Sequence, residues 1–78
     1  MSLSNKEKYY KCFEEAFEID KKNITSKLEY NSIPEWDSIG HMTLIAAIEE
    51  NFSISIETDD IIDFSSLEKG IEILKKYS

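Results

Sequence analysis

The side chains best suited to chemistry in this sequence lie in one short run, Asp37-Ser38-Ile39-Gly40-His41. Asp and Ser are both preferred at the start of a helix, and an apolar pattern with helical spacing follows them. A serine hydroxyl in this place would face the positive end of the helix dipole, where a phosphate ester is stabilised. Ser38 is therefore the candidate residue for attachment of a phosphate ester. The alternative is that Asp37 and Ser38 only satisfy the unpaired amide groups of the helix start.

His41 lies one turn beyond Ser38, so an esterase-like Ser–His pair is a second hypothesis for this run. Serine catalysis needs an oxyanion site and a group that orients the histidine, and the sequence indicates neither. We therefore expect His41 to be an exposed, neutral surface residue. A contact between His41 and a phosphate on Ser38 is the functional alternative.

The composition limits the classes of function that this chain can perform. Its 78 residues fit a single domain spanning residues 1–78, which is too short for a deep enclosed active site. Sixteen acidic residues against nine basic ones give a net charge of −7. This charge disfavours binding to nucleic acids or anionic membranes. It favours encounter with proteins that carry basic patches.

Cysteine and acidic residues give no indication of a disulfide or a metal site. Cys12 is the only cysteine and there is one histidine, so we expect Cys12 to be a small buried hydrophobic residue. Asp59, Asp60 and Asp63 lack the ligand spacing of a calcium loop. The first eleven residues lack the apolar stretch of a signal peptide, and no segment has the pattern of a membrane span. These features predict a cytoplasmic protein.

Two helices and a long connection are expected in the first two thirds of the chain. Ser4 and Glu7 form a capping-box pattern ahead of a helix expected from about Asn5 to Ile19. The aperiodic connection from Asp20 to Asp37 should be anchored by its apolar residues, which are Ile24, Leu28, Ile33 and Trp36. A second helix should run from Ser38 to about Asn51. Its core stripe would be Leu44, Ile45, Ile48 and Phe52, with Ile39, Met42 and Ala46 nearer a partner surface.

The last third of the chain predicts a short helix and a longer one. The short helix is expected at about Asp59 to Ile62, with Thr58 as its cap. Ser65 and Glu68 form a second capping box ahead of a helix that reaches about Tyr77. Gly70 inside that helix costs about 1 kcal/mol relative to alanine, which a close helix crossing would explain. The expected fold is all-α, with three longer helices and one short helix around an apolar core.

The run from Trp36 to Phe52 resembles the attachment-site helix of acyl carrier proteins and peptidyl carrier domains, in which Asp-Ser-Leu is followed by an apolar stripe, a Glu-Glu pair and a Phe. The order of elements along nearly the whole chain is similar to that family as well. The resemblance implies a four-helix bundle of acyl-carrier type, with a long loop between the first two helices and a short third helix.

The resemblance also implies a function. Ser38 would receive 4'-phosphopantetheine from coenzyme A, and the thiol of this arm would carry an acyl or aminoacyl group as a thioester. Asp37 would support the attachment site, and Ile39, Met42, Glu49 and Glu50 would contact partners. The implied partners are a magnesium-dependent phosphopantetheinyl transferase, a loading enzyme, and downstream acyltransferases, modifying enzymes or synthases. The chain itself would not be an enzyme.

Some positions depart from the fatty-acid members of that family. Gly40 and Thr43 stand where those carriers commonly have acidic residues, and Ile39 replaces the usual leucine. With Trp36 and His41, the run is more similar to that of free-standing carriers of specialised pathways. The nature of the cargo therefore stays open. The alternative function is that of a cofactor-free, acidic helical protein–protein interaction module.

Overall fold

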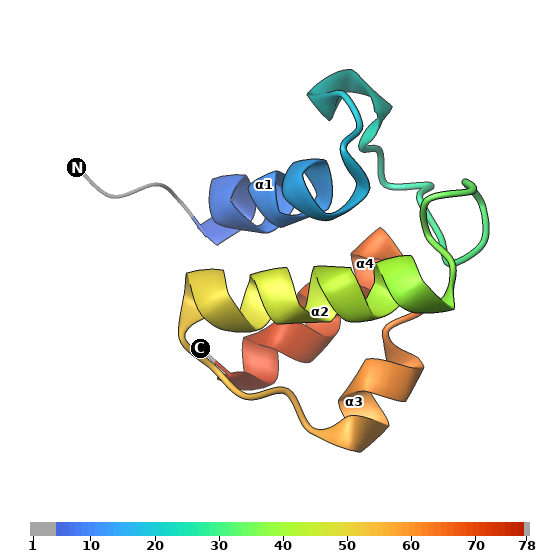
Figure 1. The fold of residues 1–78 in the computed structure, drawn as a ribbon. Coiled ribbons are helices and arrows are strands. Elements are labelled where there is room, and N and C mark those ends of the chain that lie inside the picture. Colours follow the sequence, from blue (N-terminus) through green and yellow to red (C-terminus); the bar gives the residue numbers. More distant parts are fainter. Residues whose placement is uncertain (1–4, 78) are drawn as a thin grey trace.

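The computed structural model describes residues 5–77, and every regular element in this range is helical. Four α-helices, α1 (Asn5–Phe17), α2 (Ser38–Phe52), α3 (Thr58–Asp63) and α4 (Leu67–Leu74), are joined by loops (Figure 1). Two 3-10 turns occupy Lys21–Asn23 and Lys75–Tyr77. The expected all-α class is confirmed. None of the described helices is long and apolar enough to cross a membrane.

Helix α1 ends earlier than the sequence pattern predicts. It stops at Phe17 instead of Ile19, because Glu18 adopts a left-handed conformation with φ of 53°. The amide of Glu18 still donates to the Glu14 carbonyl at 2.9 Å, which closes the last turn. Ser4, the residue predicted to cap the start of α1, lies outside the described residues.

The core lies where α1 packs on α2, and the two helices run in opposite directions (Figure 1). Most of the expected core residues are buried, and the buried residues of these two helices are Tyr9, Cys12, Phe13, Phe17, Leu44, Ile45 and Ile48. Phe52 is half-buried at the end of the stripe. Burial raises the pKa of the Cys12 thiol to about 11, so this cysteine behaves as a hydrophobic residue, as expected.

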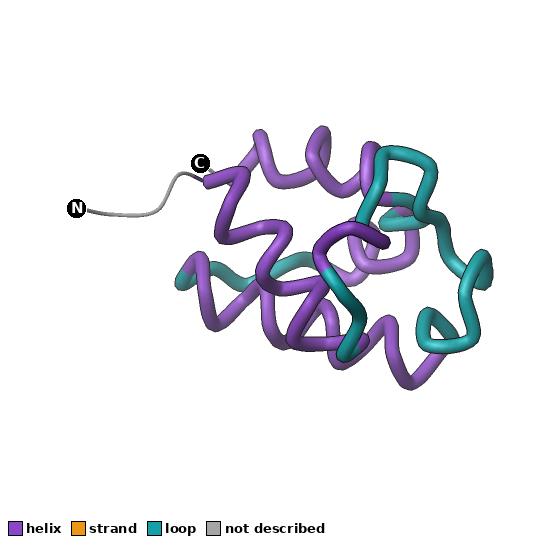
Figure 2. Tube along the Cα trace, turned by 90° about the horizontal axis from the view of Figure 1, so that it is seen from above, coloured by secondary structure: helices purple, strands orange, loops and turns teal. Residues whose placement is uncertain are grey.

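The long connection between α1 and α2 lies across one end of the helices, as the view in Figure 2 shows. Ile24 and Leu28 are 5% exposed and Trp36 is fully buried, so these three predicted anchors of the segment are confirmed. Ile33, the fourth, is half-buried and packs against the core. The Trp36 ring packs against the rings of both Phe13 and Phe17, with centroid distances of 5.5 and 5.4 Å. Trp36 therefore ties the end of the connection to α1 immediately before α2 begins.

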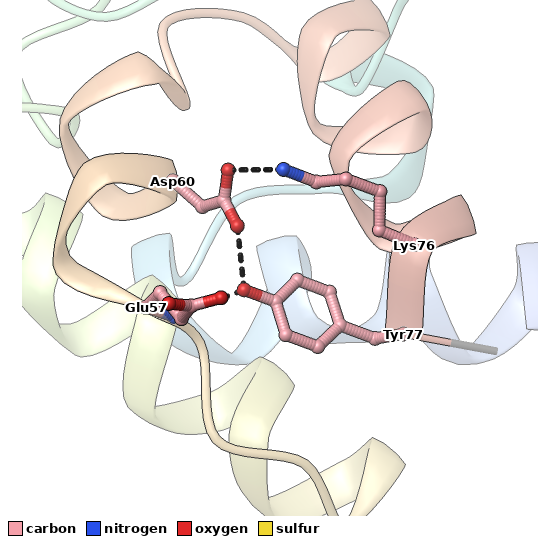
Figure 3. A network of polar contacts seen from close by, with 4 residues as sticks. All are labelled: Glu57, Asp60, Lys76 and Tyr77. Atoms are coloured by element: carbon pink, nitrogen blue, oxygen red, sulfur yellow. Dashed lines mark hydrogen bonds and ion pairs between the residues drawn. The ribbon is translucent and has the colours of Figure 1, made fainter.

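The cap of α3 differs from the prediction. Glu57, and not Thr58, is the N-cap residue, and its side chain makes no capping bond. The hydroxyl of Tyr77 takes this role from a distance, because it accepts the Glu57 amide at 3.0 Å (Figure 3). The same hydroxyl donates to Asp60, and Lys76 pairs with that carboxylate at 2.6 Å. A tertiary contact from the end of the chain thus replaces the local cap.

The cap of α4 is displaced by one residue from the prediction. Ser66, and not Ser65, accepts the Lys69 amide through its hydroxyl at 3.0 Å. The carbonyl of Ser65 instead accepts the Tyr30 amide, which joins α4 to the long connection. Gly70 is buried at a close approach, because a Cβ there would overlap the Tyr9 hydroxyl and the Phe64 ring. The expected close approach to another helix is thus made by the Tyr9 side chain of α1, and the Phe64 ring, from the segment between α3 and α4, adds a second close contact.

Candidate functional site

Ser38 is the first residue of α2, and its side chain is exposed. The carboxylate of Asp37 caps the helix by accepting the Gly40 amide at 2.8 Å, and the Asp37 carbonyl accepts the His41 amide at 2.8 Å. The Ser38 hydroxyl makes no hydrogen bond to any residue in the range 5–77. Capping therefore rests on Asp37, and the hydroxyl of Ser38 is left open to a reaction partner.

Gly40 allows the long connection to lie directly against the start of α2. A Cβ at this position would overlap the carbonyl oxygen of Glu35. A larger residue at position 40 would not fit without moving this backbone. Glycine at this position thus has a structural reason in the path of residues 35–37.

His41 is half-buried, so the expectation of an exposed surface histidine is wrong. The indole N–H of Trp36 donates to Nδ1 of His41 at 3.0 Å. An indole nitrogen can only donate, so Nδ1 must be the accepting nitrogen and the proton must be on Nε2. That proton is donated to the carbonyl oxygen of Ile61 at 2.8 Å. His41 thus bridges the long connection and α3 as a neutral imidazole.

This bridging role argues against the Ser–His hydrolase hypothesis. Both ring nitrogens of His41 are engaged, so neither can accept a proton from Ser38. The ring also lies against Trp36, in a stacked arrangement, and against Phe64. The surroundings of His41 are those of a structural residue that positions α3 beside the start of α2.

A shallow hollow of about 360 Å³ adjoins Ser38 between α2 and α3. Its walls are mostly apolar, and its lining includes Met42, Ile62 and Phe64 together with Ser38. His41 forms part of the wall and holds α3 in place there. The hydroxyl of Ser38 is therefore next to an apolar surface that a flexible group on Ser38 could contact.

Large apolar side chains that line this hollow, or that adjoin its lining residues in the sequence, are exposed. Ile39 is 79% exposed and Met42 is 55% exposed, and both face away from the core as the helical pattern predicts. Ile62 of α3 is 73% exposed, and the sequence prediction missed it. The sequence could have indicated this exposure. Ile61 and Ile62 are adjacent in a six-residue helix, so their side chains point in different directions and only one of them can be directed at the core. Ile39, Met42 and Ile62 are called the apolar rim below.

The two adjacent glutamates at the end of α2 have different environments. One carboxylate oxygen of Glu49 accepts the Ile56 amide at 2.9 Å, and the Glu49 carbonyl accepts the Ile54 amide at 3.1 Å. Glu49 therefore holds the connector to α3, a role that the sequence did not indicate. Glu50 is exposed and makes no such contact with the described residues. Of the two, Glu50 is better placed to meet another protein.

Within the described residues, no three His, Cys, Asp or Glu side chains gather in a way that could hold a metal ion. Asp60 is the one buried charged residue of this range, 6% exposed, and its pKa is lowered by the hydrogen bonds from Lys76 and Tyr77. Its carboxylate thus has a structural role in fixing α3.

Comparison with known proteins yields no match, either to a protein-family model or to a curated protein sequence. Function is therefore inferred from the residues around Ser38 and from their geometry.

Proposed function

We propose that this chain is an acyl or aminoacyl carrier protein that bears 4'-phosphopantetheine on Ser38. The observation that carries the proposal is the exposed hydroxyl of Ser38. Ser38 is the first residue of a 15-residue helix, and the preceding residue, Asp37, already caps that helix. The order of four helices, with a short α3 that flanks the attachment residue, supports a bundle of acyl-carrier type.

The start of α2 fits a phosphodiester on Ser38. The amides of Ser38 and Ile39 are the first two of the helix and have no intrahelical partner, so they can face an anionic group. The Gly40 amide is already bound by Asp37, which fixes this turn. When attached, the cofactor would supply a thiol on a flexible arm that holds the cargo as a thioester. The protein would contribute the attachment oxygen, the helix dipole and the apolar rim.

Attachment is a transfer of a phosphoryl-linked group from coenzyme A to serine. The hydroxyl oxygen of Ser38 would form a bond to the phosphorus that bears the pantetheine arm, and the bond from that phosphorus to the adenosine bisphosphate leaving group would break. The serine proton would pass to a base on the transferase, because both nitrogens of His41 are engaged. Magnesium on the transferase would offset the charge of the phosphates.

Partner enzymes would dock on the surface around Ser38. The apolar rim supplies contact area, and Glu50 and the other exposed carboxylates supply attraction for basic residues on the partner. The partners would be a phosphopantetheinyl transferase, an enzyme that loads the thiol, and downstream acyltransferases, modifying enzymes or synthases.

The test is the intact mass of the protein after incubation with coenzyme A, magnesium and a broad-specificity phosphopantetheinyl transferase. We expect one added phosphopantetheine on the wild type and on Ser55→Ala, which alters an exposed serine of the connector, and none on Ser38→Ala. An unmodified wild type, with circular dichroism showing folded protein and a control carrier modified in parallel, would contradict the proposal. That result would favour the cofactor-free interaction module.

A further inference from the structure

A second hollow, larger than the one beside Ser38, lies at the other end of α2. It has a volume of about 540 Å³ and lies where the start of α1 meets the end of α2 and the end of α4. Ser38 and Phe52 are the first and last residues of the 15-residue α2, so about 21 Å of helix lies between Ser38 and the Phe52 wall of this second hollow. We call this second one the basal hollow. Its volume is in the range of pockets that bind small molecules.

The walls of the basal hollow are apolar side chains that the core leaves partly uncovered. Phe52, Ile54 and Leu74 are half-buried, and Ile71 is 38% exposed. The ring of Tyr9 also lines the hollow, but its hydroxyl donates to the Leu67 carbonyl at 2.7 Å and is buried. The Tyr9 ring therefore acts as an apolar wall.

The charged residues that line the basal hollow are all basic, although the chain as a whole is acidic. Acidic residues outnumber basic ones by 16 to 9, yet the lining residues include three lysines and no Asp or Glu. Two of these are Lys6 and Lys8 of α1, and the third is Lys75. The ammonium of Lys8 lies 4.8 Å from the centroid of the Phe52 ring, which holds this charge at the edge of the apolar wall.

An apolar hollow with a cationic edge matches one class of small molecule. We infer that the basal hollow binds a single-chain amphiphile with a carboxylate head, with the chain against Ile54, Ile71 and Leu74 and the carboxylate beside Lys6 and Lys8. A cationic amphiphile would meet repulsion at the same edge. This site is independent of Ser38, so it exists whether or not Ser38 carries a cofactor.

The experiment is an NMR titration of the ¹⁵N-labelled full chain, in its Ser38→Ala form, with octanoate, octan-1-ol and octyltrimethylammonium. These three probes share an eight-carbon chain and differ in charge. We expect octanoate to bind tightest and to shift the amides of Ile54, Ile71 and Leu74 most. Shifts centred on Met42 and Ile62, equal affinity for all three probes, or no shifts at all would overturn the inference.

Two double variants test the role of the lysines. Lys6→Gln with Lys8→Gln should weaken octanoate binding by about 2- to 30-fold, from about 0.2–1 kcal/mol for each charge pair, and should leave octan-1-ol unchanged. Lys21→Gln with Lys22→Gln removes two exposed charges outside the hollow and should have no effect. Equal weakening of octanoate binding in the two double variants would show a general effect of net charge and overturn the inference.

Two other occupants of the basal hollow would be visible in the same samples. Shifts at Ile54 and Ile71 that grow with protein concentration, without any probe, would show that a second copy of the chain covers the hollow. Nuclear Overhauser contacts from residues 1–4 to Ile71 in the free protein would show that the chain covers it itself. Either result would overturn the inference, and neither bears on the attachment of a cofactor to Ser38.

Discussion

Replacing His41 with phenylalanine should destabilise the protein, because the histidine satisfies two polar groups at once. In His41→Phe the indole N–H of Trp36 loses its acceptor inside the core, where Trp36 is fully buried. A buried donor left without a partner costs about 1–3 kcal/mol. The Ile61 carbonyl also loses a hydrogen bond, which is worth about 1 kcal/mol. The sum predicts a loss of about 2–4 kcal/mol in the free energy of unfolding.

Urea unfolding followed by tryptophan fluorescence measures this loss directly, since Trp36 is the only tryptophan in the sequence. Thr43→Val is the matched control on the same helix. It removes an exposed hydroxyl that bonds only to the Ile39 carbonyl within α2, and we expect it to change the free energy by less than about 0.5 kcal/mol. If His41→Phe unfolds at the same urea concentration as the wild type, the bridging role of His41 is refuted.

The protonation state of His41 provides a second check on the same reasoning. The bond from Trp36 requires Nδ1 to be unprotonated and Nε2 to carry the proton. The ¹⁵N chemical shifts of the ring nitrogens distinguish the two neutral forms. A protonated Nδ1 at neutral pH would contradict the hydrogen bonds on which the expected loss of stability rests.

Three further predictions concern other residues that fix the site. Gly40→Ala should lower stability by about 1–3 kcal/mol in thermal or urea unfolding, through overlap with the Glu35 carbonyl. Helix propensity alone predicts a gain of about 1 kcal/mol in stability, so the sign of the measured change shows whether the overlap outweighs helix propensity. The ordinary pKa of an aspartate is 3.8, and hydrogen bonds from Lys76 and Tyr77 hold the pKa of Asp60 in the folded protein below that value. The unfolded chain therefore binds more protons than the folded chain as the pH falls from 3.8 towards the lower pKa of folded Asp60, and stability should fall with it. Asp60→Asn should lack that part of the pH dependence. Glu50→Lys should slow modification by the transferase about 2- to 5-fold at low salt and less at high salt, whereas Glu72→Lys on α4 should not.

The sequence predicted the features that depend on local pattern. Apolar spacing located the core residues of α2, and the Asp-Ser pair located its start. Trp36 was recognisable as an anchor because a large apolar residue in a polar, aperiodic segment needs a place in the core.

The features that the sequence did not predict depend on contacts between distant residues. Thr58 is a good cap by type, but the Tyr77 hydroxyl binds the Glu57 amide at the start of α3 from twenty positions further along the chain. His41 reads as a surface residue until Trp36 and Ile61 are placed on either side of it. Glu49 likewise holds the Ile56 amide, which no helical periodicity would reveal. Such pairings become visible only when the helices are arranged in space.

The measurement that tests the central claim most directly is tandem mass spectrometry of the protein isolated from the cells that make it. The peptide that contains Ser38 should carry one phosphopantetheine group, with the modification assigned to the Ser38 oxygen. The thiol of that group, free or acylated, would also give the mass of the cargo. A folded protein whose Ser38 is unmodified throughout the isolated population would contradict the carrier function.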